Sequence, residues 1–176
     1  MRSVYDFAQF HHVVDVGGGD GALLACLLAG CPQLRGTLFD LPHVVAKAGE
    51  VIGQAGVAGR CDVVPGSFFD GVPTGGDAYL LKNILHDWDD EHALNILRKC
   101  RAALRSDTKL LVIERILAPP NEGAEGKLSD LNMLVNAGGR ERTRKDFATL
   151  FASAGFTLSS ATPLPMSRFV MAVTGS

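Results

Sequence analysis

His86 is the residue of this chain best suited to move a proton. It lies in the segment LLKNILHDW at residues 80–88, directly after an apolar run that predicts a buried strand. An imidazole with a pKa near 6.5 can take the proton of a phenol while the phenol oxygen attacks carbon. The alternative is a histidine that only fills the core or caps a helix. Its place after a strand favours catalysis, because ligands bind at the carboxyl ends of parallel strands.

Two glutamates are candidates for holding the ring of His86. Glu114 ends an apolar run at residues 109–114, which predicts the neighbouring strand, and Glu141 follows two glycines that allow close backbone approach. A carboxylate on the far ring nitrogen would fix the tautomer and stabilise the charged ring. We therefore predict that His86, Glu114 and Glu141 form the catalytic group.

Further charged residues surround these three. Four acidic residues follow the histidine: Asp87, Asp89, Asp90 and Glu91. A metal site is one interpretation, but a helix that begins here would favour acidic residues at its N-terminus, with Asp89 or Asp90 as its cap. We expect no metal. Three arginines flank the second glutamate, namely Arg140, Arg142 and Arg144, and we expect them to form a solvated or ion-paired face.

A glycine-rich turn, VDVGGGDG at residues 14–21, is a candidate cofactor cradle. Gly17, Gly19 and Gly21 lie between a predicted strand and a predicted helix, where the lack of a Cβ allows a ligand close to the backbone. The spacing differs from the G-x-G-x-x-G of dinucleotide-binding folds, which disfavours an NAD-dependent oxidoreductase. With Asp15 beside it, the turn fits S-adenosylmethionine, which carries an amino group and a sulfonium but no phosphate. A plain glycine turn is the alternative.

Two further segments extend this cradle. Asp40 ends a predicted strand at residues 36–40, where its carboxylate can accept hydrogen bonds from two ribose hydroxyls. It could instead only cap a helix that begins near Pro42, and both roles could hold at once. Beyond the next strand, an aromatic side chain of GSFFD at residues 66–70 could lie on an adenine face, although Phe69 is equally suited to the core.

The elements that must position these residues alternate between apolar runs and helical patterns, which predicts an α/β domain. The predicted strands are residues 12–16, 36–40, 61–64, 77–81, 109–114, 156–161 and 169–173. The predicted helices are residues 22–28, 42–55, 90–104, 128–135 and 145–154, with a surface loop at 119–127. We expect a Rossmann-like, doubly wound, seven-stranded sheet, mostly parallel with an antiparallel last strand, and helices on both faces.

Bulk composition excludes several classes of protein. The 176 residues suit one domain, and 47% hydrophobic with 20% charged residues argues against disorder. A net charge of −2 gives no basic field for nucleic acid or anionic lipid, and no apolar run reaches the length of a membrane span. Four cysteines without metal-binding spacing indicate reduced thiols, and we expect a cytoplasmic protein with a small-molecule partner.

Together, VDVGGGDG, LFDLP, LLKNILHDWDDEHALNILRKC, VIE and GGRERT resemble the metal-independent small-molecule O-methyltransferases, and the wording of the HDW segment is closest to the bacterial polyketide-tailoring branch. The resemblance covers nearly the whole chain. It implies an S-adenosylmethionine-dependent enzyme that methylates a hydroxyl of a small aromatic acceptor and releases S-adenosylhomocysteine. The alternative is a relative that binds the cofactor without methylating.

The resemblance also implies roles for particular residues. The cofactor would contact the cradle and three neighbouring segments, through Asp15, Gly17, Gly19, Gly21, Asp40, Leu41, Ser67, Phe68 and Lys82. His86 would be the base, with Glu114 and Glu141 bracing it. Asp87, Met133 and Asn136 would contact the acceptor.

Two departures from the family pattern stand out. Ser67 occupies the position where the family has an aspartate that accepts a hydrogen bond from the adenine amino group, which predicts weaker cofactor binding. Family members also carry a helical N-terminal domain that forms a homodimer and closes the acceptor pocket. We expect residues 1–176 to be the cofactor-binding catalytic domain alone, without that dimerisation domain.

Overall fold

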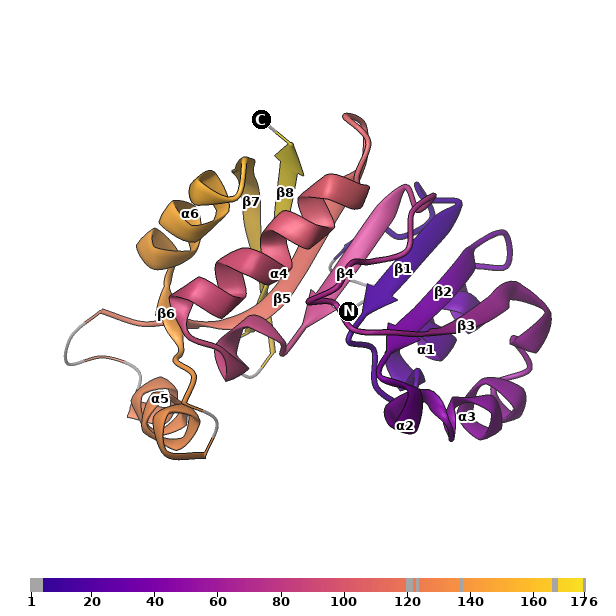
Figure 1. The fold of residues 1–176 in the computed structure, drawn as a ribbon, viewed down its shortest axis with the longest axis horizontal. Coiled ribbons are helices and arrows are strands. Elements are labelled where there is room, and N and C mark those ends of the chain that lie inside the picture. The colour runs from indigo at the N-terminus through magenta and orange to yellow at the C-terminus, as the bar shows by residue number, and fades with distance from the viewer. Residues whose placement is uncertain (1–4, 120–121, 123, 137, 166–167, 176) are drawn as a thin grey trace.

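One mixed sheet organises the molecule (Figure 1). The computed structural model describes residues 5–119, 122, 124–136, 138–165 and 168–175, and the side chains of residues 124, 125 and 136 also lie outside the description. The strands are β1 (His12–Val16), β2 (Arg35–Asp40), β3 (Cys61–Pro65), β4 (Ala78–Lys82), β5 (Lys109–Leu117), β6 (Arg142–Thr143), β7 (Phe156–Leu164) and β8 (Arg168–Gly175). Their order is β3-β2-β1-β4-β5-β8-β7, with the short β6 beside β5.

The direction and order of the strands predict where a ligand binds, at the carboxyl ends of the central strands. Strands β1 to β5 run parallel, whereas β8 is antiparallel to both β5 and β7. The chain moves outward from β1 through β2 to β3 and then returns to place β4 on the other side of β1. The carboxyl ends of β1 and β4 therefore flank a switch point, where ligands bind in open α/β sheets.

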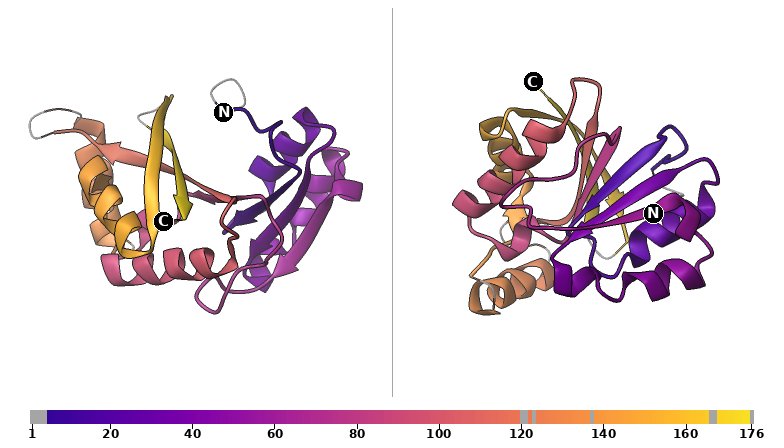
Figure 2. Two further views of the ribbon diagram at one scale, coloured as in Figure 1. Left: turned by 90° about the horizontal axis from the view of Figure 1, so that it is seen from above. Right: turned by 45° about the vertical axis from the view of Figure 1, so that its right-hand side comes forward.

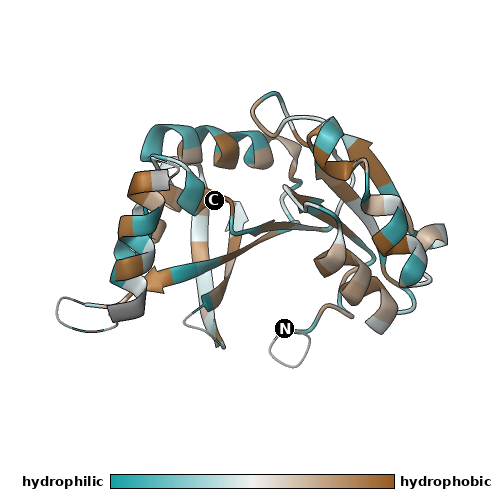
Figure 3. Cartoon of the chain, turned by 90° about the horizontal axis from the view of Figure 1, so that it is seen from below, coloured by the Kyte–Doolittle hydropathy of each residue, from teal (hydrophilic) through white to brown (hydrophobic). Residues whose placement is uncertain are grey.

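Helices cover both faces of the sheet (Figure 2). They are α1 (Ala22–Gly30), α2 (Pro42–Val45), α3 (Ala48–Gln54), α4 (Asp90–Ala103), α5 (Ala124–Asn136) and α6 (Arg144–Ser153), with 3₁₀ turns η1 (Ala58–Arg60) and η2 (Leu85–Asp87). Alternate strand residues face opposite ways, so Leu80 packs toward α1 and α3 whereas Tyr79 and Leu81 pack toward α4 and α6. Several helices carry hydrophilic as well as hydrophobic residues (Figure 3), and in α4 the buried positions Ala93, Ile96, Leu97 and Cys100 lie on one side, as expected for a helix that buries one face. Helix α1, with the sequence ALLACLLAG, has no hydrophilic residue.

The predicted fold class is confirmed, and all seven predicted strands form. The structure adds β6, whose pairing with Ile116 and Leu117 extends β5 three residues beyond Glu114. The predicted helix at residues 42–55 is divided into α2 and α3 at the exposed Ala46 and Lys47, where no buried side chain requires the helix to continue.

The predicted surface loop at residues 119–127 is partly wrong, because α5 begins at Ala124. The start of this helix packs closely on β5, since a Cβ on Gly126 would lie only 3.3 Å from Cδ2 of Leu117. Within the described residues, no helix is both long and apolar enough to cross a membrane.

Candidate active site

The glycine-rich turn connects β1 to α1 through three left-handed residues. Gly17, Gly19 and Gly21 have φ angles of +69°, +65° and +83°, which residues with a Cβ rarely adopt. The amide of Gly17 donates to the carbonyl of Phe39 at 2.8 Å, which ties the turn to the end of β2. A Cβ on Gly19 would meet no atom within 4 Å, so the centre of the turn faces open space. The backbone thus presents an accessible surface at the switch point.

Asp40 holds the far side of this turn. Its Oδ2 accepts a hydrogen bond from the amide of Gly19 at 2.9 Å, and its Oδ1 accepts one from the amide of Leu41 at 2.7 Å. The helix-capping alternative is wrong, because Leu41 is the N-cap of α2 and no side chain caps that helix. Leu41 itself is exposed beside the turn.

Beneath the turn, Asp15 is buried and has an oxygen without a partner. The residue is 1% exposed, and its Oδ2 makes no hydrogen bond. Burial raises the pKa of Asp15 to about 7, although the nearby Lys82 ammonium opposes this rise. A cavity of about 110 Å³ is lined by Asp15, Gly17, Gly18, Asp20, Ala22, Leu23 and Lys82. A buried carboxylate and a lysine therefore share a space with the glycines, among them Gly18, which the sequence analysis did not select.

The segment after β3 brings aromatic rings to the same edge. The ring centroids of Phe68 and Phe69 are 4.9 Å apart, and Phe69 lies 4.7 Å from the Trp88 ring in an edge-to-face arrangement. The core alternative for Phe69 is thus favoured. Ser67 uses its Oγ to accept a hydrogen bond from the amide of Phe69 at 3.2 Å, which fixes the turn.

Gly17 links this cradle to the segment that carries His86. A Cβ on Gly17 would collide with Cδ1 of Ile84 and approach Cε1 of Phe68 to 3.6 Å. Only glycine therefore lets the three segments meet. The turn after β4 begins at Asn83, which has a φ of +55° and belongs to the residue type that best tolerates this conformation. Ile84 then lies against the glycine turn, two residues before His86.

Glu114 holds the backbone of the His86 segment. The carboxylate is fully buried at the edge formed by β4 and β5, and its Oε1 accepts hydrogen bonds from the amides of Ile84 and Leu85, both at 2.9 Å. Its Oε2 faces Nδ1 of His86 at 3.5 Å. One carboxylate thus positions both the turn and the ring.

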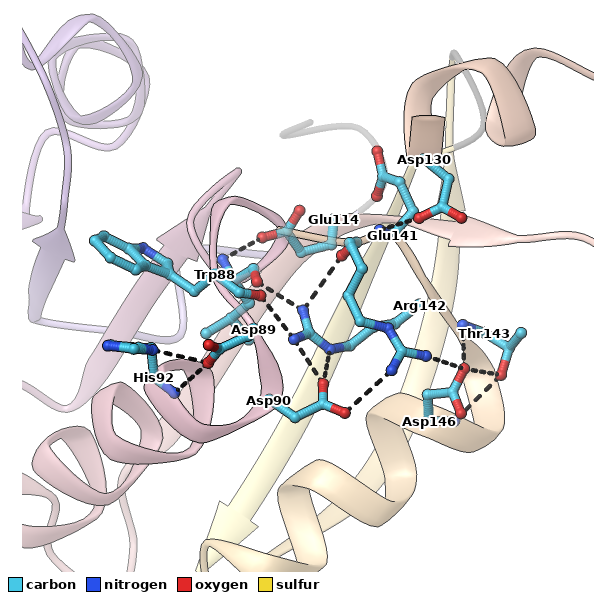
Figure 4. A network of polar contacts seen from close by, with 12 residues as sticks. Trp88, Asp89, Asp90, His92, Glu114, Asp130, Glu141, Arg142, Thr143 and Asp146 are labelled. Carbon is cyan, nitrogen blue, oxygen red and sulfur yellow. Dashed lines mark hydrogen bonds and ion pairs between the residues drawn. The ribbon is translucent and has the colours of Figure 1, made fainter. Parts of the chain in front are cut away.

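Glu141 approaches the same ring nitrogen from another element. Its Oε1 lies 3.6 Å from Nδ1 of His86 and accepts a hydrogen bond from Oγ of Ser129 at 2.7 Å. The amide of Glu141 donates to Oδ1 of Asp130 at 2.8 Å (Figure 4). Ser129 and Asp130 belong to α5, and nothing in their sequence context singled them out. The structure therefore brings the three predicted catalytic residues together and adds two supports.

Electrostatics within this group favour a charged His86. Burial disfavours protonation of the ring, but the carboxylates of Glu141 and Glu114 outweigh it and raise the pKa of His86 above its ordinary value. Burial raises the pKa of Glu114 to about 7. Burial acts in the same direction on Glu141, yet its contacts with His86 and Ser129 prevail and lower its pKa.

The other predicted contacts have different outcomes. Asp87 is partly exposed and places Oδ1 3.4 Å from Nε2 of His86. Met133 lies one helical turn after Ser129 on α5 and is partly buried. The side chain of Asn136 lies outside the described residues.

The acidic run after His86 does not form the metal site considered above. Asp89 is the N-cap of α4 and accepts a hydrogen bond from the amide of His92 at 2.9 Å, as predicted. In the part of the chain that the structure describes, the ligand-type atoms that cluster are those of His86, Glu114 and Glu141, which lie within 4.8 Å of one another. A metal ion bound by this cluster would therefore be held by the three predicted catalytic residues themselves.

With this geometry established, comparison with known proteins gives the family. A family model described as an O-methyltransferase domain matches residues 1–157. The chain belongs to this O-methyltransferase domain family. Phenazine O-methyltransferase PhzM of Lysobacter antibioticus is 48% identical to it over 159 residues, covering 90% of this chain and 47% of the relative. The chain spans about half the length of the curated relatives it matches.

Solved structures of O-methyltransferases have the same fold. NcsB1, from neocarzinostatin biosynthesis, was solved in complex with S-adenosylmethionine and 2-hydroxy-5-methyl naphthoic acid. It matches with a TM-score of 0.88 and 40% identity, over 98% of this chain and 51% of NcsB1. Aclacinomycin 10-hydroxylase RdmB of Streptomyces purpurascens is also 42% identical over 159 residues, covering 89% of this chain and 42% of RdmB. Relatives of this O-methyltransferase domain thus include a protein named for another reaction.

Proposed function

We propose that this chain forms the cofactor-binding and catalytic part of an enzyme that transfers a methyl group from S-adenosylmethionine to a hydroxyl of a small aromatic acceptor. The observation that carries the proposal is one juxtaposition. His86 lies in a turn whose Ile84 packs on Gly17, and its Nδ1 faces both Glu114 and Glu141. A proton acceptor and a ligand cradle therefore share one edge of the sheet.

The residues of the cradle fit the cofactor. Asp15 lines a cavity, and its buried Oδ2 has no hydrogen-bond partner in the structure. Gly19 leaves its backbone accessible to a ligand, because it has no side chain to cover it. The glycine turn would take the methionine end, Asp40 and Leu41 the ribose, and Ser67 and Phe68 the adenine, with Lys82 at the rim. When bound, S-adenosylmethionine supplies an electrophilic methyl group.

His86 acts as the general base that takes the proton of the acceptor hydroxyl. With a hydrogen on Nδ1 facing the two glutamates, the lone pair on Nε2 is free to accept the proton of a hydroxyl. As the hydroxyl loses its proton to Nε2, its oxygen becomes the nucleophile, and the positive charge that develops on the ring is stabilised by Glu114 and Glu141. Only the neutral ring can act as the base. Because the pKa of His86 is raised, the neutral ring becomes abundant only at higher pH.

The acceptor class rests on the relatives of this chain. NcsB1 and PhzM are named or solved with aromatic compounds, and Met133 lies on α5 beside the residues that hold Glu141. Asp87, next to Nε2 of His86, would orient the acceptor hydroxyl. The homodimer stays a prediction of the family resemblance.

A non-methylating role is the second candidate, because RdmB is named as a hydroxylase. Incubation of the purified protein with isotopically labelled S-adenosylmethionine and a panel of phenols, followed by mass spectrometry, distinguishes the two. Methyl transfer predicts a labelled methyl ether and one S-adenosylhomocysteine for each ether formed. Tight binding of the cofactor without any labelled ether would instead support the second candidate.

A further inference from the structure

Arg142 is a fully buried arginine outside the predicted catalytic group. Its side chain is 1% exposed, whereas Arg140 and Arg144 are exposed, so Arg142 does not lie on a solvated face. The predicted ion pairing is confirmed for two of the three arginines, because Arg142 pairs with Asp90 and Arg140 pairs with Asp90 and Asp146. All five N–H donors of its guanidinium have acceptors. Nε donates to Oδ1 of Asp90 at 2.9 Å. Nη2 donates to the same oxygen at 2.8 Å and to the carbonyl of Trp88 at 2.9 Å. Nη1 donates to the carbonyl of Leu85 at 2.6 Å and to the carbonyl of Arg140 at 3.4 Å.

The acceptors on the turn flank the catalytic residue. The carbonyls of Leu85 and Trp88 stand on either side of His86 and Asp87, so one guanidinium spans the η2 turn. Figure 4 shows the Arg142 side chain beside Asp90 and Trp88. A planar guanidinium suits this task, because its donors point in fixed directions and can bond several acceptors at once. Asp90 supplies the negative charge that a buried cation needs.

Contacts from other residues hold the same turn on its remaining sides. Oε1 of Glu114 accepts the amides of Ile84 and Leu85, while the amide of Arg140 donates to the carbonyl of His86 at 2.9 Å. A Cβ on Gly139 would lie 2.5 Å from the backbone carbon of Asp87, which shows how closely the two segments pack. Glu114 and the segment at residues 139–142 therefore hold the turn together.

The sequence neighbour of Arg142 is Glu141, and the two side chains act on different parts of the same segment. Glu141 faces the His86 ring, whereas Arg142 holds the backbone carbonyls around it. We propose that Arg142 is a positioning residue, which fixes the His86 turn relative to Glu141 so that Nδ1 faces the carboxylates and Nε2 is left for the acceptor. This inference rests on the proposed function, because it gives His86 the role of base.

The test compares Arg142→Lys with Arg144→Lys in the whole chain. Lysine keeps the positive charge but cannot reach two separated carbonyls and Asp90 together. Thermal unfolding and S-adenosylhomocysteine affinity are measured first, then kcat, KM for the acceptor, and the titration of the His86 ring by NMR. Arg144 is exposed and close in sequence, so its lysine variant controls for the same chemical change.

We expect Arg142→Lys to remain folded, with cofactor affinity within about twofold of wild type and kcat reduced about 10- to 100-fold, because small displacements of a catalytic group cost this much. The NMR pKa of His86 should fall toward its ordinary value as the contact with Glu141 is lost. Arg144→Lys should match wild type in every measurement. An unfolded Arg142→Lys chain, or one with unchanged kcat and an unchanged His86 titration, would contradict the proposal.

A second variant separates geometry from charge. Arg142→Ala should regain part of its kcat when guanidinium is added at millimolar concentration, but none when ammonium is added. Rescue by both ions, or by neither, would overturn the proposal. If wild type forms no methyl ether, the proposed function fails, whereas the NMR titration of His86 in Arg142→Lys still decides whether Arg142 positions the ring.

Discussion

Gly17 and Ile84 are in direct contact, so that a Cβ on the glycine would collide with Cδ1 of the isoleucine. The first residue belongs to the turn after β1, and the second to the turn after β4 that carries His86. This contact joins the proposed ligand cradle to the proposed proton acceptor. It also makes the two parts of the site separately testable, because the cradle should govern affinity and the histidine should govern rate.

The cradle can be tested with a matched pair of glycines. Gly19 and Gly56 have φ angles of +65° and +69°, and a Cβ on either would meet no atom within 4 Å. Alanine should therefore cost a similar free energy of unfolding at both, about 1 kcal/mol. Calorimetry should show S-adenosylhomocysteine binding weakened about tenfold or more by Gly19→Ala. Gly56→Ala should bind like wild type, and an equal loss in both variants would place the cofactor elsewhere.

Glu141→Gln should move the pH dependence of the rate. Glu141 raises the pKa of His86, so its neutralisation lowers that pKa and extends the neutral base to lower pH. The acid limb of the kcat profile should shift to lower pH, while kcat on the plateau falls because the charged ring loses a partner. The exposed Glu50→Gln is the control. An acid limb that stays in place or moves to higher pH would remove Glu141 from the account.

Ser67→Asp should strengthen cofactor binding. A carboxylate accepts the hydrogen bond of an amino group more strongly than a hydroxyl does, by about 1 kcal/mol, or roughly fivefold in Kd. Equilibrium binding of S-adenosylmethionine measures the change, and Ser106→Asp on an exposed turn controls for added negative charge. Equal or weaker binding by Ser67→Asp would show that this position does not meet the adenine amino group.

Chelation tests whether the catalytic group works without a metal. His86, Glu114 and Glu141 could hold an ion, but in the proposed mechanism the His86 ring takes the proton itself and no metal is required. Activity should therefore persist in EDTA and should not increase when zinc or magnesium is added. Loss of activity in EDTA, with recovery on adding one metal, would assign an ion to these three residues instead.

Much of the fold follows from local patterns. The buried runs around Val14 and Leu80 have the length and boundaries of parallel strands, and the glycine turn marks the switch point. Strand β6 has only two residues, too few for any periodicity, and it pairs with the end of β5, which continues beyond Ile113, where its pairing with β4 ends. The first turn of α5 packs closely on β5 at Gly126, a tertiary contact that local sequence does not encode.

Some residues of the candidate site could likewise be predicted from the sequence, whereas others could not. His86 and Glu114 could be predicted because each follows or ends an apolar strand, and topology then brings such ends together. Arg142 could not be distinguished from Arg140 and Arg144, since its burial depends on carbonyls more than fifty residues earlier in the chain. Ser129 escaped notice because a serine within a helix usually faces solvent, and its hydrogen bond to Glu141 joins residues twelve positions apart.

The most direct test of the central claim is His86→Ala measured beside the exposed His11→Ala. If His86 removes the proton of the acceptor, kcat for methylation of a phenol should fall about 10²- to 10⁴-fold, while S-adenosylhomocysteine affinity changes less than about twofold. His11→Ala should retain the wild-type rate. Methylation by His86→Ala at the wild-type rate would contradict the account.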